Sequence, residues 1–73
     1  TMTKKDYELI AGVFNTQFIR NDSLNDLHSP KWREKENTIA MSMIDMAVAL
    51  EQDNKRFNAD TFFNACRKDT KTH

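Results

Sequence analysis

Apolar side chains recur at helical spacing through the first third of the chain, with polar residues between them. Tyr7, Ile10, Ala11, Phe14 and Phe18 fall on one stripe of a helix. Thr3 and Asp6 stand three residues apart, which is the spacing of a capping box that opens a helix. This pattern predicts a helix over residues 4–20, followed by a polar connector over residues 21–28.

A second helical pattern begins at Ser29-Pro30, because serine is a favoured N-cap and proline is tolerated at the first helical position. It predicts a helix over residues 30–53. The principal apolar stripe of this segment consists of Trp32, Ile39, Met43, Met46 and Leu50. A second apolar stripe, made of Met41, Ile44 and Val48, points well away from the first. Such a helix must be covered on more than one side.

A short third helix is predicted over residues 58–68. Asn58 is the expected N-cap, and Phe57 and Phe62 have the spacing of a hydrophobic staple. Phe62, Phe63 and Cys66 are its expected buried residues. Residues 69–73 contain no apolar side chain and are predicted to fray. The chain is thus predicted to form one all-α domain over residues 1–73, an antiparallel helical hairpin with the short third helix packed across it.

The second stripe, Met41, Ile44 and Val48, has two interpretations. In the first, the third helix folds back and covers it. In the second, it is an interface for a second copy or for a partner protein, because methionine-rich helical faces adapt to partner surfaces. Asp45 lies on the polar strip of the same helix, where it is solvated or hydrogen-bonds within such an interface.

The charge balance bears on the choice of partner. Eleven basic residues stand against eleven acidic ones, which argues against a polyanion coat or a polybasic membrane binder. Residues 1–54 carry six basic and nine acidic side chains, a net charge of −3, whereas residues 55–73 carry five and two, a net charge of +3. This separation of charge could guide an antiparallel homodimer or dock an acidic partner, and it favours protein partners.

The location expected from the sequence is the cytoplasm. A single cysteine cannot form an intramolecular disulfide, so a reducing compartment is favoured. No segment resembles the apolar core of a signal peptide, and no run approaches the roughly 20 apolar residues that span a bilayer.

Catalytic chemistry finds little support in the residues. To act as a nucleophile, Cys66 would need a nearby base, but His28 lies in a loop and His73 at the end of the chain. One cysteine and two distant histidines also lack the spacing of a zinc ligand pair. Asn21, Asp22, Asn25 and Asp26 form an oxygen-rich run that lacks the glycine and glutamate of a calcium loop. That run is predicted to be a solvated connector. No catalytic, cofactor-binding or metal-binding residue is assigned, and the chain is not expected to be an enzyme.

Basic residues beside aromatic ones suggest an alternative, a small nucleic-acid-binding or regulatory protein. Lys31, Arg33 and Lys35 surround Trp32, and Lys55 and Arg56 precede Phe57. Such groups neutralise phosphates and stack on bases. Glu34 and Glu36 interrupt the first cluster, which makes this the second hypothesis after a protein-interaction module.

The two ends of the chain carry short motifs in common with a family. The motifs are Lys4-Lys5-Asp6-Tyr7 with Ile10-Ala11, then Asn54-Lys55-Arg56-Phe57-Asn58 with Phe62, Ala65 and Cys66. They resemble the pattern Lys-Asp-Tyr-x-x-Ile-Ala and Asn-Pro-Arg-Phe-Asp-x-x-x-Phe-x-x-Ala-Cys of small helical proteins encoded by bacteriophages and actinobacteria. Here Lys55 replaces the proline, Asn58 replaces the aspartate, and Arg67 stands where a glycine often follows. The resemblance implies an accessory protein of a phage or mobile element, in the bacterial host cytoplasm, that binds a host or defence protein; it implies no activity.

Overall fold

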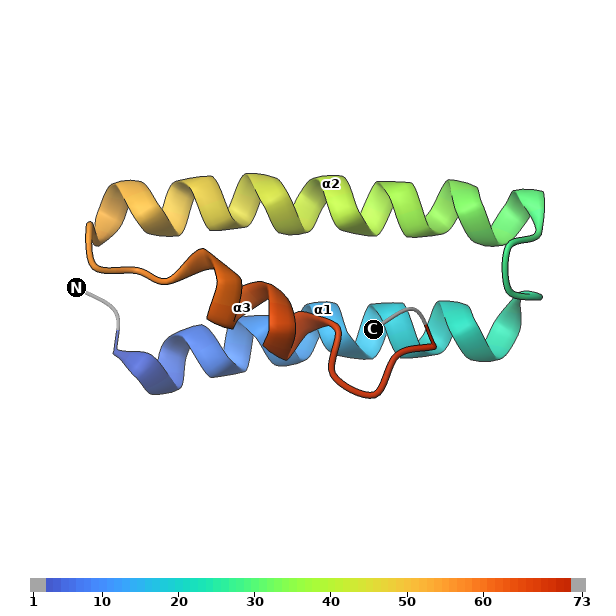
Figure 1. Cartoon of the computed structure of the whole chain (residues 1–73), viewed down its shortest axis with the longest axis horizontal. Coiled ribbons are helices and arrows are strands. Elements are labelled where there is room, and N and C mark those ends of the chain that lie inside the picture. The colour runs from blue at the N-terminus through green and yellow to red at the C-terminus, as the bar shows by residue number, and fades with distance from the viewer. Residues whose placement is uncertain (1–2, 72–73) are drawn as a thin grey trace.

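The computed structural model describes residues 3–71, which form three helices and no strand. They are α1 (Lys4–Leu24), α2 (Pro30–Asp53) and α3 (Ala59–Cys66). The helices α1 and α2 lie side by side and run in opposite directions, and α3 packs against both of them (Figure 1). The predicted all-α hairpin with a short third helix is therefore confirmed.

Each helix begins at the cap that the sequence predicts. The Thr3 hydroxyl accepts from the Asp6 backbone at 3.4 Å, and the Asp6 carboxylate accepts from the Thr3 backbone at 2.9 Å. The Ser29 hydroxyl caps α2, and the Asn58 side chain caps α3 by accepting from Thr61 N at 3.1 Å. These contacts satisfy backbone N–H groups that have no partner within the helix.

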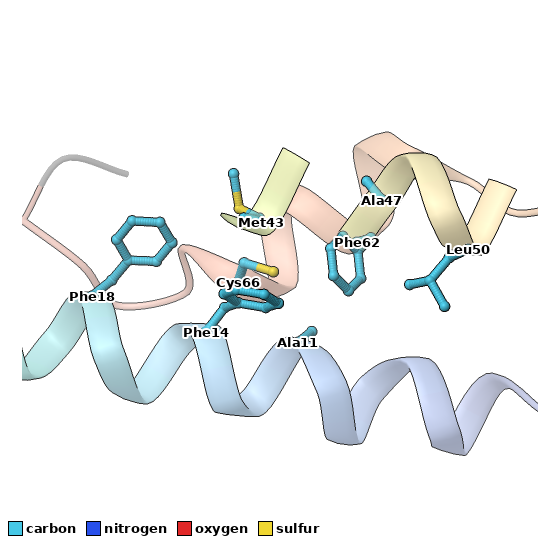
Figure 2. Packing of buried hydrophobic residues seen from close by; sticks show 8 residues of the cluster. All are labelled: Ala11, Phe14, Phe18, Met43, Ala47, Leu50, Phe62 and Cys66. Atoms are coloured by element: carbon cyan, nitrogen blue, oxygen red, sulfur yellow. The ribbon is translucent and has the colours of Figure 1, made fainter. Parts of the chain in front are cut away.

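The hydrophobic core lies where the three helices meet (Figure 2). It contains Ala11, Phe14 and Phe18 from α1, Met43, Ala47 and Leu50 from α2, and Phe62 and Cys66 from α3. The ring centroids of Phe57 and Phe62 are 5.5 Å apart, which confirms the predicted staple at the start of α3. Met46, assigned to the principal stripe of α2, is exposed, while Ala47, on the other edge of that stripe, is buried.

The predicted end of α1 at Arg20 is wrong, because the helix continues to Leu24. Asn21 and Asp22 are buried rather than solvated. The Asn21 side-chain amide donates to the Trp32 carbonyl at 3.1 Å, and the Asp22 carboxylate accepts from the Trp32 indole N–H at 2.9 Å. These partners in α2 remove the competition with the backbone that normally makes Asn and Asp end a helix. The connector is therefore confined to residues 25–29.

The end of the described chain also departs from the prediction. Asn58 is the N-cap of α3, as predicted, but the helix ends at Cys66, two residues before the predicted end. The Asn15 side-chain amide donates to the carbonyls of Cys66 at 3.0 Å and Lys68 at 2.6 Å. The Lys71 backbone N–H donates to the Asp22 carboxylate at 2.9 Å. Of residues 69–71, Lys71 is therefore attached to α1 by a hydrogen bond, and the prediction of fraying is wrong there; residues 72 and 73 lie outside the described part.

Arg67 joins all three helices at the point where α3 ends. Its guanidinium lies 4.4 Å from the centroid of the Phe18 ring on α1. It also forms an ion pair with Glu36 on α2, with 2.9 Å between nitrogen and oxygen. Both side chains are partly buried, so the ion pair is screened less than one on the open surface.

Candidate functional site

The second apolar stripe of α2 faces solvent. Met41 is 67% exposed, Ile44 50% and Val48 52%. The prediction that the third helix covers this stripe is wrong, because α3 directs Phe62 and Cys66 into the core between α1 and α2 (Figure 2). We call Met41, Ile44 and Val48 the outer face of α2. Among residues 3–71, nothing covers it.

The surroundings of the outer face are acidic. At 3.6 residues per turn, Glu34 and Asp45 fall on one flank of the stripe, while Glu51 and Arg33 fall on the other. All four of these side chains are exposed. The outer face is therefore an apolar strip within a region of net negative charge.

Two further exposed apolar side chains lie on α1. Leu9 is 72% exposed and Val13 is 55% exposed. The polar residues Thr16 and Arg20 follow them on that side of α1, so the apolar strip is shorter than the outer face of α2. Leu9 and Val13 are therefore a matched control for the outer face rather than an equal candidate.

The structure does not bring the two predicted basic clusters together. Lys31, Arg33 and Lys35 lie in the first turns of α2, whereas Lys55 and Arg56 follow its other end, roughly 30 Å away at 1.5 Å per residue. Trp32 is only 5% exposed, and its indole N–H is bonded to Asp22. Trp32 is thus part of the folded interior, as its place on the principal stripe of residues 30–53 predicts, and its ring is not available to stack on bases.

Cys66 is fully buried, as the sequence predicts for a structural thiol. Burial raises its pKa from 9.0 to about 11, and the neighbouring Arg67 lowers it by a smaller amount. The thiol is therefore protonated at neutral pH. A protonated, inaccessible thiol is a poor nucleophile and a poor metal ligand.

Metal binding finds no support in the described residues. Within residues 3–71, no group of three His, Cys, Asp or Glu side chains is arranged to hold an ion. Within the oxygen-rich run, Asp22 is buried and its two carboxylate oxygens accept from Trp32 and Lys71. None of the helices described in this range combines the length and apolarity needed to cross a membrane.

The structure also contains a pocket that the sequence does not predict. It lies where α1 begins, α2 ends and α3 begins, and Tyr7, Phe57 and Phe62 line it. The spacing of Phe57 and Phe62 indicated that these two rings meet, but Tyr7 is 50 residues away from Phe57 in the chain. Only the antiparallel hairpin brings them together.

Comparison of the chain with models of protein families, with curated proteins and with solved structures finds no significant match.

Proposed function

We propose that this protein is a non-enzymatic interaction module that binds a partner protein through the outer face of α2. The observation that carries the proposal is the exposure of Met41, Ile44 and Val48 on one side of a helix whose opposite side forms the core. Burying such a strip against a partner removes apolar surface from water, at about 25 cal/mol per Å². Methionine adds adaptable packing at such surfaces.

The charges around the outer face favour a partner other than a second copy. In an antiparallel pairing of two α2 helices centred on Ile44, Asp45 of one copy would lie beside Asp45 of the other. Like charges in such a position oppose association. The complementary partner presents an apolar strip with lysine or arginine residues on its flanks, a common arrangement when an amphipathic helix occupies a partner surface.

The resemblance of the two ends of the chain to phage and actinobacterial accessory proteins directs the search for this partner. It suggests host or defence proteins of a bacterial cytoplasm. The nucleic-acid alternative has no observation in its favour, since Trp32 is buried and the basic clusters are separated. A salt-dependent shift of a DNA or RNA probe at about 50 mM salt would be needed to revive it.

The proposal can be tested by photo-crosslinking in the cells from which the gene derives. A benzophenone amino acid is placed at Ile44 in one variant and at Leu9 in a control variant, because both positions are exposed and apolar. We expect a discrete covalent adduct from position 44 and none from position 9. The adduct should disappear when Met41→Ser and Val48→Ser are added, and persist when Leu9→Ser and Val13→Ser are added instead.

Two results would overturn the proposal. One is the absence of any adduct that depends on Met41 and Val48. The other is an adduct of two copies of this chain only, together with a dimer in light scattering that Ile44→Ser converts to a monomer. That pair of results would make the outer face a self-association surface.

A further inference from the structure

A pocket of about 370 Å³ opens at the end of the hairpin where α1 begins and α2 ends. The region is at the blue end of α1 in Figure 1, beside the start of α3. Ala11 and Phe62, which are 1% and 3% exposed, form its floor. Tyr7 and Phe57 are half-buried and form its walls. Binding sites for small organic molecules start at about this volume and are mostly apolar inside.

The aromatic walls are held in place by contacts within the fold. The ring centroids of Tyr7 and Phe57 lie 5.1 Å apart at 62°, in an edge-to-face arrangement. Phe57 also packs on Phe62, with 5.5 Å between the centroids. The Asn54 side-chain amide donates to the Tyr7 hydroxyl at 3.1 Å. A site held in this way loses little conformational entropy when a ligand enters.

The rim of the pocket carries two cations and one anion. Lys4 and Arg56 line the pocket together with Glu8, and all three side chains are exposed. Within residues 3–71, no ion pair joins Glu8 to either cation. The Tyr7 hydroxyl accepts from Asn54, so its own proton is left to donate to a ligand.

From these observations we propose that the pocket binds a small carboxylic acid with an aromatic body. The ring of the ligand lies against Tyr7, Phe57 and Phe62, where aromatic pairs favour edge-to-face or offset contacts. The carboxylate lies at the rim, where Lys4 and Arg56 provide charge-assisted hydrogen bonds. The volume of about 370 Å³ matches one ring with a short acid chain. None of the outer-face residues lines this pocket, so the inference is independent of the proposed function.

The inference is tested by titrating the full isotope-labelled chain with 3-phenylpropanoate and following backbone amide shifts by NMR. We expect saturable shifts of residues that line the pocket, such as Tyr7, Phe57 and Thr61. The neutral analogue 3-phenylpropanamide keeps the ring and removes the charge. It should bind at least about tenfold more weakly, because a factor of ten corresponds to losing one charge-assisted hydrogen bond and both Lys4 and Arg56 face the carboxylate.

Variants distinguish binding in the pocket from nonspecific attraction of the acid to surface cations. Lys4→Gln and Arg56→Gln should each weaken binding of the acid several-fold, whereas Lys5→Gln, an exposed lysine that does not line the pocket, should leave it unchanged. Thr61→Trp, a substitution at an exposed lining position, should fill the pocket and abolish binding while the helical circular dichroism is retained. Linear shifts without saturation, equal binding of acid and amide, or equal effects of Lys5→Gln and Arg56→Gln would overturn the inference.

Discussion

The two ends of the hairpin are closed by different chemistry. Where α1 begins and α2 ends, aromatic rings meet: Tyr7 contacts Phe57, and Phe57 contacts Phe62. At the opposite end, polar groups meet around Trp32, whose indole and carbonyl groups are bonded to Asp22 and Asn21. The aromatic end is stabilised by the removal of apolar surface from water, an effect that depends little on the orientation of the groups. The polar end depends on directed hydrogen bonds, each of small net value but costly to leave unmade.

This difference sets how each end responds to substitution. At the aromatic end, the loss scales with the volume removed from the core. At the polar end, the loss depends on whether a buried donor keeps an acceptor. A chain of 73 residues has a small margin of stability, so both kinds of loss are measurable.

The largest effect is expected for Phe62→Ala at the aromatic end. Phe62 is 3% exposed and contacts both Phe14 and Phe57. Its truncation should lower the free energy of unfolding by about 3–5 kcal/mol. Urea denaturation followed by circular dichroism measures the loss. Phe63→Ala removes the same atoms from a half-buried neighbour and should cost less; equal losses would show that the core is not centred on Phe62.

A pH-dependent effect is expected at Cys66, which lies between the two ends. Burial holds the pKa of its thiol at about 11 in the folded chain, against 9.0 ordinarily. Between these values the unfolded state releases a proton that the folded state keeps. Stability is therefore intact below about pH 9 and falls as the pH rises toward 11, by about 2–3 kcal/mol in total.

The matched control for this effect is Cys66→Ala, which removes the titrating group and leaves the rest of the sequence unchanged. Urea titrations at several pH values give the difference in unfolding free energy between the two chains. The advantage of the cysteine form should shrink above pH 9. Parallel pH profiles would contradict a raised thiol pKa.

At the polar end, Asp22→Ala is expected to cost about 1–3 kcal/mol, because it leaves the buried Trp32 indole N–H without an acceptor. The same change removes the acceptor for the Lys71 backbone N–H. Hydrogen exchange at that amide should accelerate along with the loss of stability. Asp26→Ala in the exposed connector serves as the control and should change neither quantity. If the exchange rate of the Lys71 amide is unchanged in Asp22→Ala, the attachment of the C-terminal segment does not depend on the polar end.

The smallest effects are expected at the helix caps, one at each end. Ser29 caps α2 at the polar end, and Asn58 caps α3 at the aromatic end. Replacement of either by alanine should cost about 1 kcal/mol. For a domain of this size that corresponds to a fall of about 4–8 °C in the melting temperature. A much larger fall for one cap than for the other would show that one end has little stability of its own.

Local patterns predicted much of the fold because they act within a few residues. The capping box at Thr3, the Ser29-Pro30 start and the Asn58 cap are each complete within one helical turn. The bounds of α2 at 30 and 53 follow from such signals at its start and from the polar turn after it. The core stripe of α1 likewise follows from its 3.6-residue period.

The remainder depends on partners distant in the sequence. Asn21 and Asp22 have the composition of a connector, and their helical state depends on Trp32. The segment 67–71 contains no apolar residue, yet Asn15 bonds to the carbonyl of Lys68 and Asp22 to the backbone N–H of Lys71, each from about 50 positions away. The outer face of α2 was found from its spacing, but only the position of α3 decides that it is exposed. The aromatic pocket likewise requires Tyr7 and Phe57 to meet.

The chain has one tryptophan and one tyrosine, and the fold assigns one to each end of the hairpin. Trp32 reports on the polar end through its bonded indole, and Tyr7 reports on the aromatic end through its contact with Phe57. The protein thus carries two intrinsic optical reporters that need no label. If the hairpin unfolds as a unit, their transitions coincide along a denaturant series. If one end opens first, the order of the two signals identifies that end.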